Sequence, residues 1–142
     1  MAVSEEQLRS LKDRARRMRI DILKMLHGCG SGHTGGSLSA TDIMTALYFY
    51  KMKYDPKKPD WKERDYFILS KGHAAAALYA ALAFKGYFPE EELDTYCQDG
   101  GRLAEHRDAL LVQVRDRGVE VVDVQRHMVA PDVAVAGDVG RL

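Results

Sequence analysis

The feature that most constrains the fold of this 142-residue chain is an amphipathic segment near its N-terminus. Apolar residues recur there every three or four positions: Leu8, Leu11, Ala15, Met18, Ile22 and Met25. This spacing places them on one face of an α-helix that must be buried on that side. Ser4 and Gln7 form the S-x-x-Q pattern of a capping box, and Gly28 is expected to end the helix. The length suits one domain with a modest core.

Four further elements are predicted downstream. Residues 40–52 are apolar almost all round, which predicts a buried helix beginning at Ser39. Residues 66–69 are apolar and bounded by polar residues, as in a buried strand. Residues 72–86 are rich in alanine and strongly helical, and Pro89 followed by three glutamates starts another short helix. Helices that alternate with a strand favour an α/β fold in which helices dominate.

Composition excludes several classes of protein. Lysine plus arginine equals aspartate plus glutamate, at 21 each, so nothing favours nucleic acid or an anionic membrane as a partner. The N-terminus lacks the apolar core of a signal peptide, and no apolar run approaches the ~20 residues of a membrane span. Two cysteines, Cys29 and Cys97, are too few and too far apart for a zinc knuckle and fit a reduced, cytoplasmic protein.

A glycine-rich stretch, GCGSGHTGGS, occupies residues 28–37, and Gly30 to Gly35 satisfy the spacing G-x-G-x-x-G. A dinucleotide-binding loop of this pattern needs a strand before it and a helix after it. Here the preceding segment is the long amphipathic helix, and no Walker lysine follows, so both nucleotide-binding interpretations fail. The structural alternative is a helix cap followed by a turn into the helix at Ser39.

Three histidines lie in glycine-rich or element-terminal settings: His33, His73 and His106. His73 lies just past the predicted strand, at the start of the alanine-rich helix, a position where α/β proteins bind ligands and where a helix N-terminus favours phosphate. A neutral imidazole can hold a sugar hydroxyl or a phosphate oxygen, or move a proton near pH 7. For any one of these three histidines taken alone, a purely structural role stays open. His27 and His127 lack such settings and are interpreted as surface or packing residues.

Three segments in order, GSGHTGGSLSATDIMTALYFYKM, ERDYFILSKGHAAAALYAAL and FKGYFPEEEL, resemble the N-terminal region of transketolase, most closely the split type in which this region is a separate chain. The resemblance covers about residues 10–106. It implies a thiamine-diphosphate-binding fold, partial and helix-rich in this chain, with a parallel sheet flanked by helices. It also implies an enzyme that transfers a two-carbon ketol unit from a ketose phosphate to an aldose phosphate.

The resemblance assigns catalytic roles to the three histidines. His33 falls in the family's Gly-His-Pro-Gly motif, which contacts substrate, with Thr34 in place of the proline. His73 corresponds to the histidine near the cofactor diphosphate and the donor substrate, and is the expected cofactor-binding residue. His106 falls where the family has a Gly-His-Pro histidine, but its neighbours here are glutamate and arginine. The change from proline to threonine relaxes one backbone dihedral and should be tolerated.

Beyond His106 the composition changes, which divides the chain into residues 1–106 and a divergent tail, 107–142. The tail contains ten valines where residues 1–106 contain one, and all its residues except Met128 can be encoded by codons beginning with G or C. We therefore expect part of the tail to be a frameshifted reading of a transketolase gene; the alternative is a genuine valine-rich segment. Residues 118–121, GVEV, still resemble the family, and the valines from Val119 to Val124 predict a strand in either case.

The resemblance also implies thiamine diphosphate and magnesium as cofactors. The family holds both through a Gly-Asp-Gly segment and a later asparagine, whereas Gly137-Asp138 here lacks the second glycine and is interpreted as a chance match. No metal ligand is therefore assigned. The glutamate that activates the cofactor belongs to the family's pyrimidine domain, so we expect the chain alone to bind the cofactor weakly and to be inactive.

The resemblance implies sugar-phosphate substrates, a partner that is a C-terminal transketolase half or second subunit, an oligomer, and a cytoplasmic role in carbohydrate metabolism such as the pentose phosphate pathway. Two alternatives stay open. The first is another thiamine-diphosphate enzyme, such as a 1-deoxyxylulose-5-phosphate synthase. The second is a non-catalytic interaction fragment, because the exposed apolar surface of a half-domain would favour association.

Overall fold

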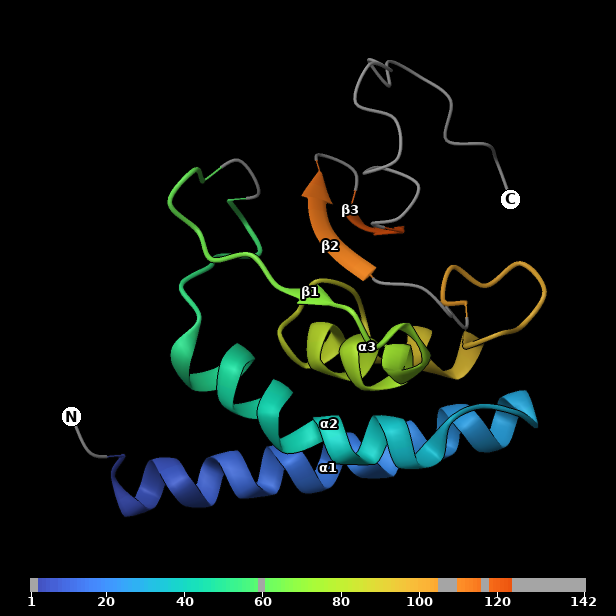
Figure 1. Ribbon diagram of the computed structural model, residues 1–142, viewed down its shortest axis with the longest axis horizontal. Coiled ribbons are helices and arrows are strands. Elements are labelled where there is room, and N and C mark those ends of the chain that lie inside the picture. Colours follow the sequence, from blue (N-terminus) through green and yellow to red (C-terminus); the bar gives the residue numbers. More distant parts are fainter. Residues whose placement is uncertain (1–2, 59–60, 105–109, 116–117, 124–142) are drawn as a thin grey trace.

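The computed structural model describes residues 3–58, 61–104, 110–115 and 118–123. In chain order the elements are α1 (Glu5–Cys29), α2 (Thr34–Ala46), η1 (Leu47–Lys51), β1 (Ile68–Leu69), η2 (Gly72–Ala74), α3 (Ala75–Phe84), η3 (Glu90–Thr95), β2 (Leu110–Arg115) and β3 (Gly118–Asp123). Figure 1 shows α1 and α2 packed along one another, with α3 between this pair and the strands. The fold is α/β and helix-rich, as predicted. No helix in the described ranges combines the length and the apolar character that crossing a bilayer requires.

Helix α1 begins as its sequence predicts. Gln7 N donates to Ser4 Oγ at 3.1 Å and Ser4 N donates to Gln7 Oε1 at 3.0 Å, which completes the capping box. The helix passes through Gly28 and ends at Cys29, because the left-handed residue that caps it is Gly30, with φ of 70°. The glycine that ends the helix is therefore Gly30, two residues after the expected Gly28. The core-facing residues are Ala15, Met18, Ile22, Met25 and Leu26.

Helix α2 begins at Thr34, five residues before the predicted start at Ser39. Gly30 and Gly32, with φ of 70° and 126°, reverse the chain so tightly that the next helix starts at once. The segment is also less buried than its composition suggested, since Ile43 is 64% exposed. Its buried face carries threonines instead: the Thr41 hydroxyl donates to the Ser37 carbonyl at 3.0 Å and so needs no partner outside the helix.

Helix α3 is the centre of the core. Every residue from Ala75 to Ala83 is at most 4% exposed, and the helix contacts α1, α2 and η3. The small alanine side chains allow these neighbours to approach closely on several sides. The alanine-rich helix predicted from the sequence is thus confirmed. The short helix predicted after Pro89 is also present, as the 3₁₀-helix η3.

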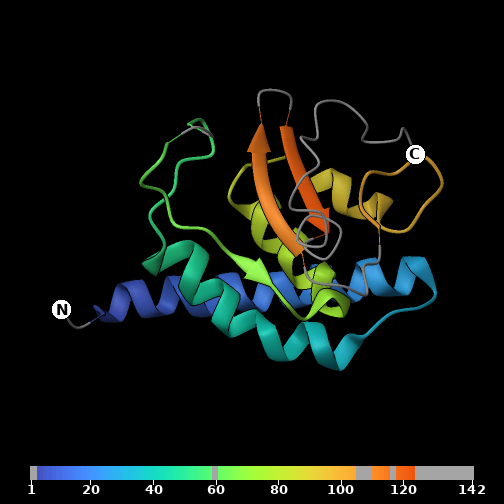
Figure 2. The same ribbon diagram turned by 45° about the horizontal axis from the view of Figure 1, so that its top comes forward.

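The three described strands form a sheet in the order β1-β2-β3, and both pairs are antiparallel. Figure 2 shows β2 and β3 as a hairpin. Only residues 116 and 117 separate these two strands, and so short a connection permits antiparallel pairing alone. The parallel sheet that the resemblance implies is therefore not what these strands form. The strand predicted among the valines is confirmed as β3.

Strand β1 differs from its prediction in length and burial. It contains only Ile68 and Leu69, where the sequence predicted a buried strand over residues 66–69. Leu69 is buried, but Tyr66 and Ile68 are 58% and 54% exposed. Alternate residues of a strand point to opposite faces, so a short edge strand buries only one of its two faces. The chain leaving β1 leads directly into η2 and α3. Because η2 contacts α2, His73, which lies in η2, is placed beside α2.

Candidate functional site

The structure brings two of the three predicted site histidines together. His33 directly precedes α2, and His73 lies in η2 just before α3. Their ring centroids are 5.0 Å apart, with the ring planes inclined by 52°. Two imidazoles that are distant in sequence thus share one small region, at the N-terminal ends of two helices. His33 is exposed and His73 is half-buried, so the region is open to a ligand.

Gly36, in the first turn of α2, makes this arrangement possible. A Cβ atom at Gly36 would lie 2.9 Å from His73 Cδ2 and 3.2 Å from His73 Nε2. The first of these distances is shorter than packed carbon atoms tolerate. The absence of a side chain at Gly36 therefore lets the backbone of α2 lie directly against the imidazole of His73.

Lys71 joins the two halves of the site. Its Nζ donates to the Gly36 carbonyl at 3.2 Å and to Ser39 Oγ at 3.1 Å, and Ser39 Oγ itself donates to the same carbonyl at 3.0 Å. The segment that carries His73 is thereby tied to the first turn of α2. The sequence interpretation used the Ser-Lys-Gly-His segment but assigned only its histidine. The signal it missed was a lysine two residues before that histidine, beside a helix start.

Ser37 adds a second group that sequence reasoning missed. Its side chain is buried, and among the described residues its Oγ has no hydrogen-bond partner. A buried hydroxyl without a partner costs free energy, so most such groups in proteins are satisfied. Ser37 follows Gly36 directly, but its Oγ is buried inside the fold and is not exposed to a ligand.

The electrostatic character of the region favours anions. Lys71 contributes a positive charge, and α2 and α3 both direct their N-terminal ends, which carry partial positive charge, toward the same place. Backbone N–H groups at such ends are suited to phosphate oxygens. The two imidazoles can each donate or accept a hydrogen bond, the capacity that general acid–base catalysis requires. The arrangement can thus bind a phosphate group and move a proton beside it.

Several predicted positions do not contribute to this geometry. His106 lies outside the described residues, as do His127, Gly137 and Asp138. His27 is exposed in the last turn of α1, in agreement with its interpretation as a surface residue. In the part of the chain that the structure describes, no three side chains of His, Cys, Asp or Glu lie close enough to hold a metal ion.

Comparison with known proteins identifies a match over residues 10–122 to the family described as transketolase, thiamine diphosphate binding domain. The match extends past residue 106 and includes Gly118 to Val121. The 6-deoxy-6-sulfo-D-fructose transketolase subunit SqwG of Clostridium sp. (strain MSTE9) is 50% identical over 106 residues, which are 75% of this chain and 38% of that protein. An apulose-4-phosphate transketolase subunit of Phocaeicola vulgatus is 39% identical over 106 residues, which are 75% of this chain and 36% of that protein.

A solved structure supports the same family. Transketolase from Leishmania mexicana matches with a TM-score of 0.63 and 33% sequence identity, over 68% of this chain and 14% of that one. The chain therefore spans a little over a third of the two relatives named as subunits and about a seventh of this larger protein. The boundary drawn at residue 106 stays a prediction.

Proposed function

Because this chain belongs to the transketolase family, through the thiamine diphosphate binding domain that residues 10–122 match, we propose that it contributes one part of an enzyme that moves a two-carbon ketol unit between sugar phosphates. The observation that carries the proposal is the approach of His33 to His73, at 5.0 Å, where two helix N-termini meet. A phosphate-bearing cofactor and a sugar phosphate both need such a positive, proton-exchanging region.

The residues present fit the diphosphate end of thiamine diphosphate. His73 and the N-terminal end of α3 offer hydrogen-bond donors, and Lys71 brings a positive charge to the same edge. When bound, the cofactor supplies the stabilised carbanion chemistry that ketol transfer needs. We assign His73 to hold the cofactor and the donor substrate, and His33 to hold a substrate hydroxyl and exchange its proton. His106 stays a proposed third substrate contact.

Magnesium, unlike the diphosphate, does not fit the residues that the structure describes. The ion prefers an octahedral set of oxygen ligands, usually including carboxylates. Among residues 3–58, 61–104 and the described strands, no cluster of three potential ligands is present. These residues do not fit a metal site, and we assign no step to a metal.

We propose that the partner of this chain is a second transketolase subunit. The support comes from the relatives, since two of them are named as subunits of transketolases and this chain spans about a third of each. The substrates are proposed to be sugar phosphates in general, because nothing in the described site selects one sugar. Action in the cytoplasm, in the pentose phosphate pathway, is part of the same proposal.

The test combines the chain with the remaining part of the diphosphate-binding subunit and with the C-terminal subunit of a split transketolase, thiamine diphosphate and magnesium, because the chain spans only about a third of the subunits it resembles. Ketol transfer from a ketose phosphate to an aldose phosphate is then measured. We expect transfer by the mixture, and a fall in kcat/KM of about 100-fold or more for His33→Ala, the usual effect of losing a proton-transfer group. The control is His27→Ala, an exposed histidine at the end of α1, which should retain full activity.

Two other outcomes would each contradict a part of this proposal. Binding of the second subunit without any transfer would support an interaction fragment and contradict an enzyme. We also expect isothermal titration of the isolated chain with thiamine diphosphate and magnesium to show no tight binding. Tight binding by this chain alone would refute the idea that the cofactor site needs a second subunit.

A further inference from the structure

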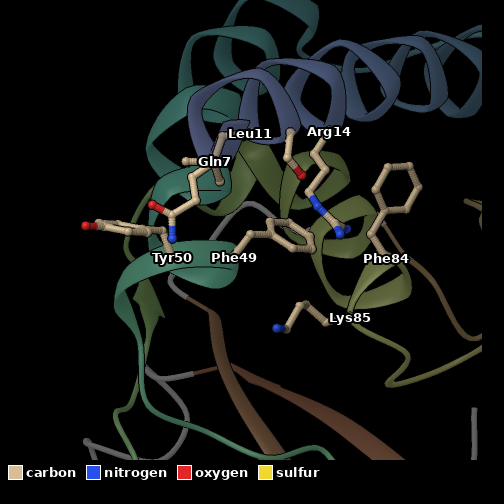
Figure 3. Close-up of a pocket in the computed structure, with 8 residues that line it drawn as sticks. Gln7, Leu11, Arg14, Phe49, Tyr50, Phe84 and Lys85 are labelled. Carbon is tan, nitrogen blue, oxygen red and sulfur yellow. The ribbon is translucent and has the colours of Figure 1, made fainter. Parts of the chain in front are cut away.

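A cavity lies far from the histidines, at the opposite ends of α2 and α3. It has a volume of about 330 Å³ and is formed by the first half of α1, by η1 and by the end of α3 (Figure 3). His33 and Gly36 lie at the start of α2, whereas Phe49 follows its far end. At 1.5 Å per residue, the two regions are separated by roughly 20 Å of helix.

Two positive side chains flank one aromatic ring in this cavity. The guanidinium carbon of Arg14 lies 4.8 Å from the centre of the Phe49 ring, and Lys85 Nζ lies 5.4 Å from the same centre. Figure 3 shows Arg14 and Lys85 extending toward Phe49 from opposite sides of the cavity. Contact with an aromatic ring stabilises each cation modestly but leaves its charge uncompensated.

Arg14 differs from the other arginines of its helix. Each of those pairs with a carboxylate: Arg9 with Glu5, Arg16 with Asp13, Arg17 with Glu90 and Arg19 with Asp42. Neither the Arg14 nor the Lys85 side chain has an ion pair or hydrogen bond with the described part of the chain, and no acidic residue lines the cavity there. Two cations thus share a partly enclosed space that provides no counter-charge.

The lowered pKa of Lys85 is consistent with a cavity that provides no counter-charge. Its burial lowers the pKa of the ammonium group, and the nearby charge of Arg14 lowers it further. Both effects disfavour the charged form. A bound anion would oppose both, because a negative charge nearby favours a protonated lysine.

Gln7 adds a neutral donor to the same cavity. Its Oε1 accepts the capping hydrogen bond from Ser4 N at 3.0 Å, which leaves the Nε2 amide group for another acceptor. Phe84 and Tyr50 line the cavity beside Phe49 and supply apolar surface. The cavity therefore combines nitrogen donors with aromatic walls, and its volume is at the small end of the range for ligand sites.

We propose that this cavity binds a small phosphate monoester that carries a ring or a similar apolar group. The phosphate, which carries up to two negative charges at neutral pH, would be bound by Arg14, Lys85 and Gln7. The apolar group would pack on Leu11 and Tyr50, which also line the cavity, because Arg14 and Lys85 flank the Phe49 ring and Arg17 covers the Phe84 ring. The site is distinct from the histidine region and does not depend on the function proposed above.

The test is isothermal titration of the 142-residue chain with phenyl phosphate at pH 7.5 and low salt. Inorganic phosphate and phenol are titrated in parallel, and each should bind at least tenfold more weakly than phenyl phosphate because each lacks one half of the recognised chemistry. Arg14→Gln and Lys85→Gln should each raise the Kd at least tenfold. Arg16→Gln is the matched control on the same helix, with an exposed side chain that pairs with Asp13 outside the cavity, and should change the Kd less than twofold.

Three results would overturn the proposal. One is no binding of phenyl phosphate by wild-type chain whose circular dichroism shows it folded. Another is binding that survives Arg14→Gln and Lys85→Gln but is lost in His33→Ala, which would place the ligand at the histidines. The third is tighter binding of an acidic peptide such as tetraglutamate, which would show a protein-docking surface. Should a cavity variant fail to fold, amide NMR shifts of Gln7, Phe49 and Lys85 in the wild-type chain decide the location.

Discussion

At the scale of single residues, the candidate site depends on the missing side chain of Gly36. The backbone of α2 touches the His73 ring there, and Lys71 donates to the carbonyl of the same glycine. Gly35, its neighbour in the same turn, has nothing within 4 Å of the position a Cβ would take. Alanine substitutions at these two glycines therefore form a matched pair, because only a side chain at Gly36 would contact His73.

Gly36→Ala should displace the His73 ring while leaving the fold intact. The added methyl would lie 2.9 Å from a side-chain atom that can move, and alanine is favoured over glycine in a helix by about 1 kcal/mol. We expect an unchanged or slightly raised free energy of unfolding, shifted NMR resonances of the His73 ring, and kcat/KM lowered about tenfold or more in the two-subunit assay.

Gly35→Ala is the control for this prediction. It gains the same helix propensity without a close contact, so its stability should rise by at least as much as that of Gly36→Ala while the His73 resonances stay in place. Identical His73 spectra in the two variants would contradict the role given to Gly36.

The same residues show how far sequence reasoning reached at this scale. The sequence singles out His33 and His73 because each lies in a motif whose neighbours define its setting; the structure places their rings close together, and their roles stay predictions. The contacts of Lys71 with Gly36 and Ser39 could not, because they join segments more than thirty residues apart. Which polar groups meet across such a distance depends on how α2 packs on η2, and no local pattern encodes that packing.

At the scale of elements, α3 determines how closely the helices approach one another. Its own alanines are buried against its neighbours, and Tyr79 OH donates to the Ala104 carbonyl at 3.1 Å, which links α3 to the segment after η3. Because α3 follows η2 directly, any shift of this helix would also move His73. The core and the site are thus coupled through one short element.

Ala80→Leu should destabilise the fold by about 1–3 kcal/mol, because a larger side chain at a close-packed position forces its neighbours apart. Ala80 is 0% exposed. Ala46, the last residue of α2, is exposed, and Ala46→Leu should change the free energy of unfolding by no more than about 0.5 kcal/mol. Urea unfolding of both variants measures the difference, and equal destabilisation would contradict close packing around α3.

Element type was easier to predict than element boundaries, for physical reasons that particular residues show. The amphipathic period of α1 and the alanines of α3 determine their type locally, whereas α2 starts early because two positive-φ glycines, Gly30 and Gly32, shorten its connection. Which side chains are buried was harder still to predict from the sequence. Ile43 is exposed although its neighbours are apolar, since the side of a helix that meets α1 and α3 depends on their placement.

At the scale of the whole molecule, three tyrosines connect η1 with the segments that flank β1 and α3. The rings of Tyr54 and Tyr87 stack at 5.8 Å, those of Tyr48 and Tyr54 meet edge-on at 5.7 Å, and Tyr54 OH donates to the Tyr48 carbonyl at 2.8 Å. Burial raises the pKa of Tyr48 and Tyr54, and it raises the pKa of Tyr87 to about 12. The fold therefore holds these phenols in their neutral form.

The molecule should consequently lose stability as pH rises above about 10. An unfolded tyrosine ionises near pH 10, so between there and pH 12 the unfolded state binds fewer protons than the folded state, and its free energy falls relative to the folded one. The tyrosine contribution is fully present below pH 10. Urea unfolding at pH 8, 9, 10 and 11 should show a midpoint that declines above pH 10.

Tyr48→Phe should make this decline shallower, because it removes one phenol that only the unfolded state can ionise, while its ring stays in the core. Tyr66→Phe is the control, since the Tyr66 side chain is 58% exposed and its removal should leave the slope unchanged. Lys85, whose pKa is lowered by burial, contributes with the opposite sign, but it does so equally in wild type and both variants. Equal slopes for Tyr48→Phe and Tyr66→Phe would show that the buried tyrosines do not cause the alkaline loss.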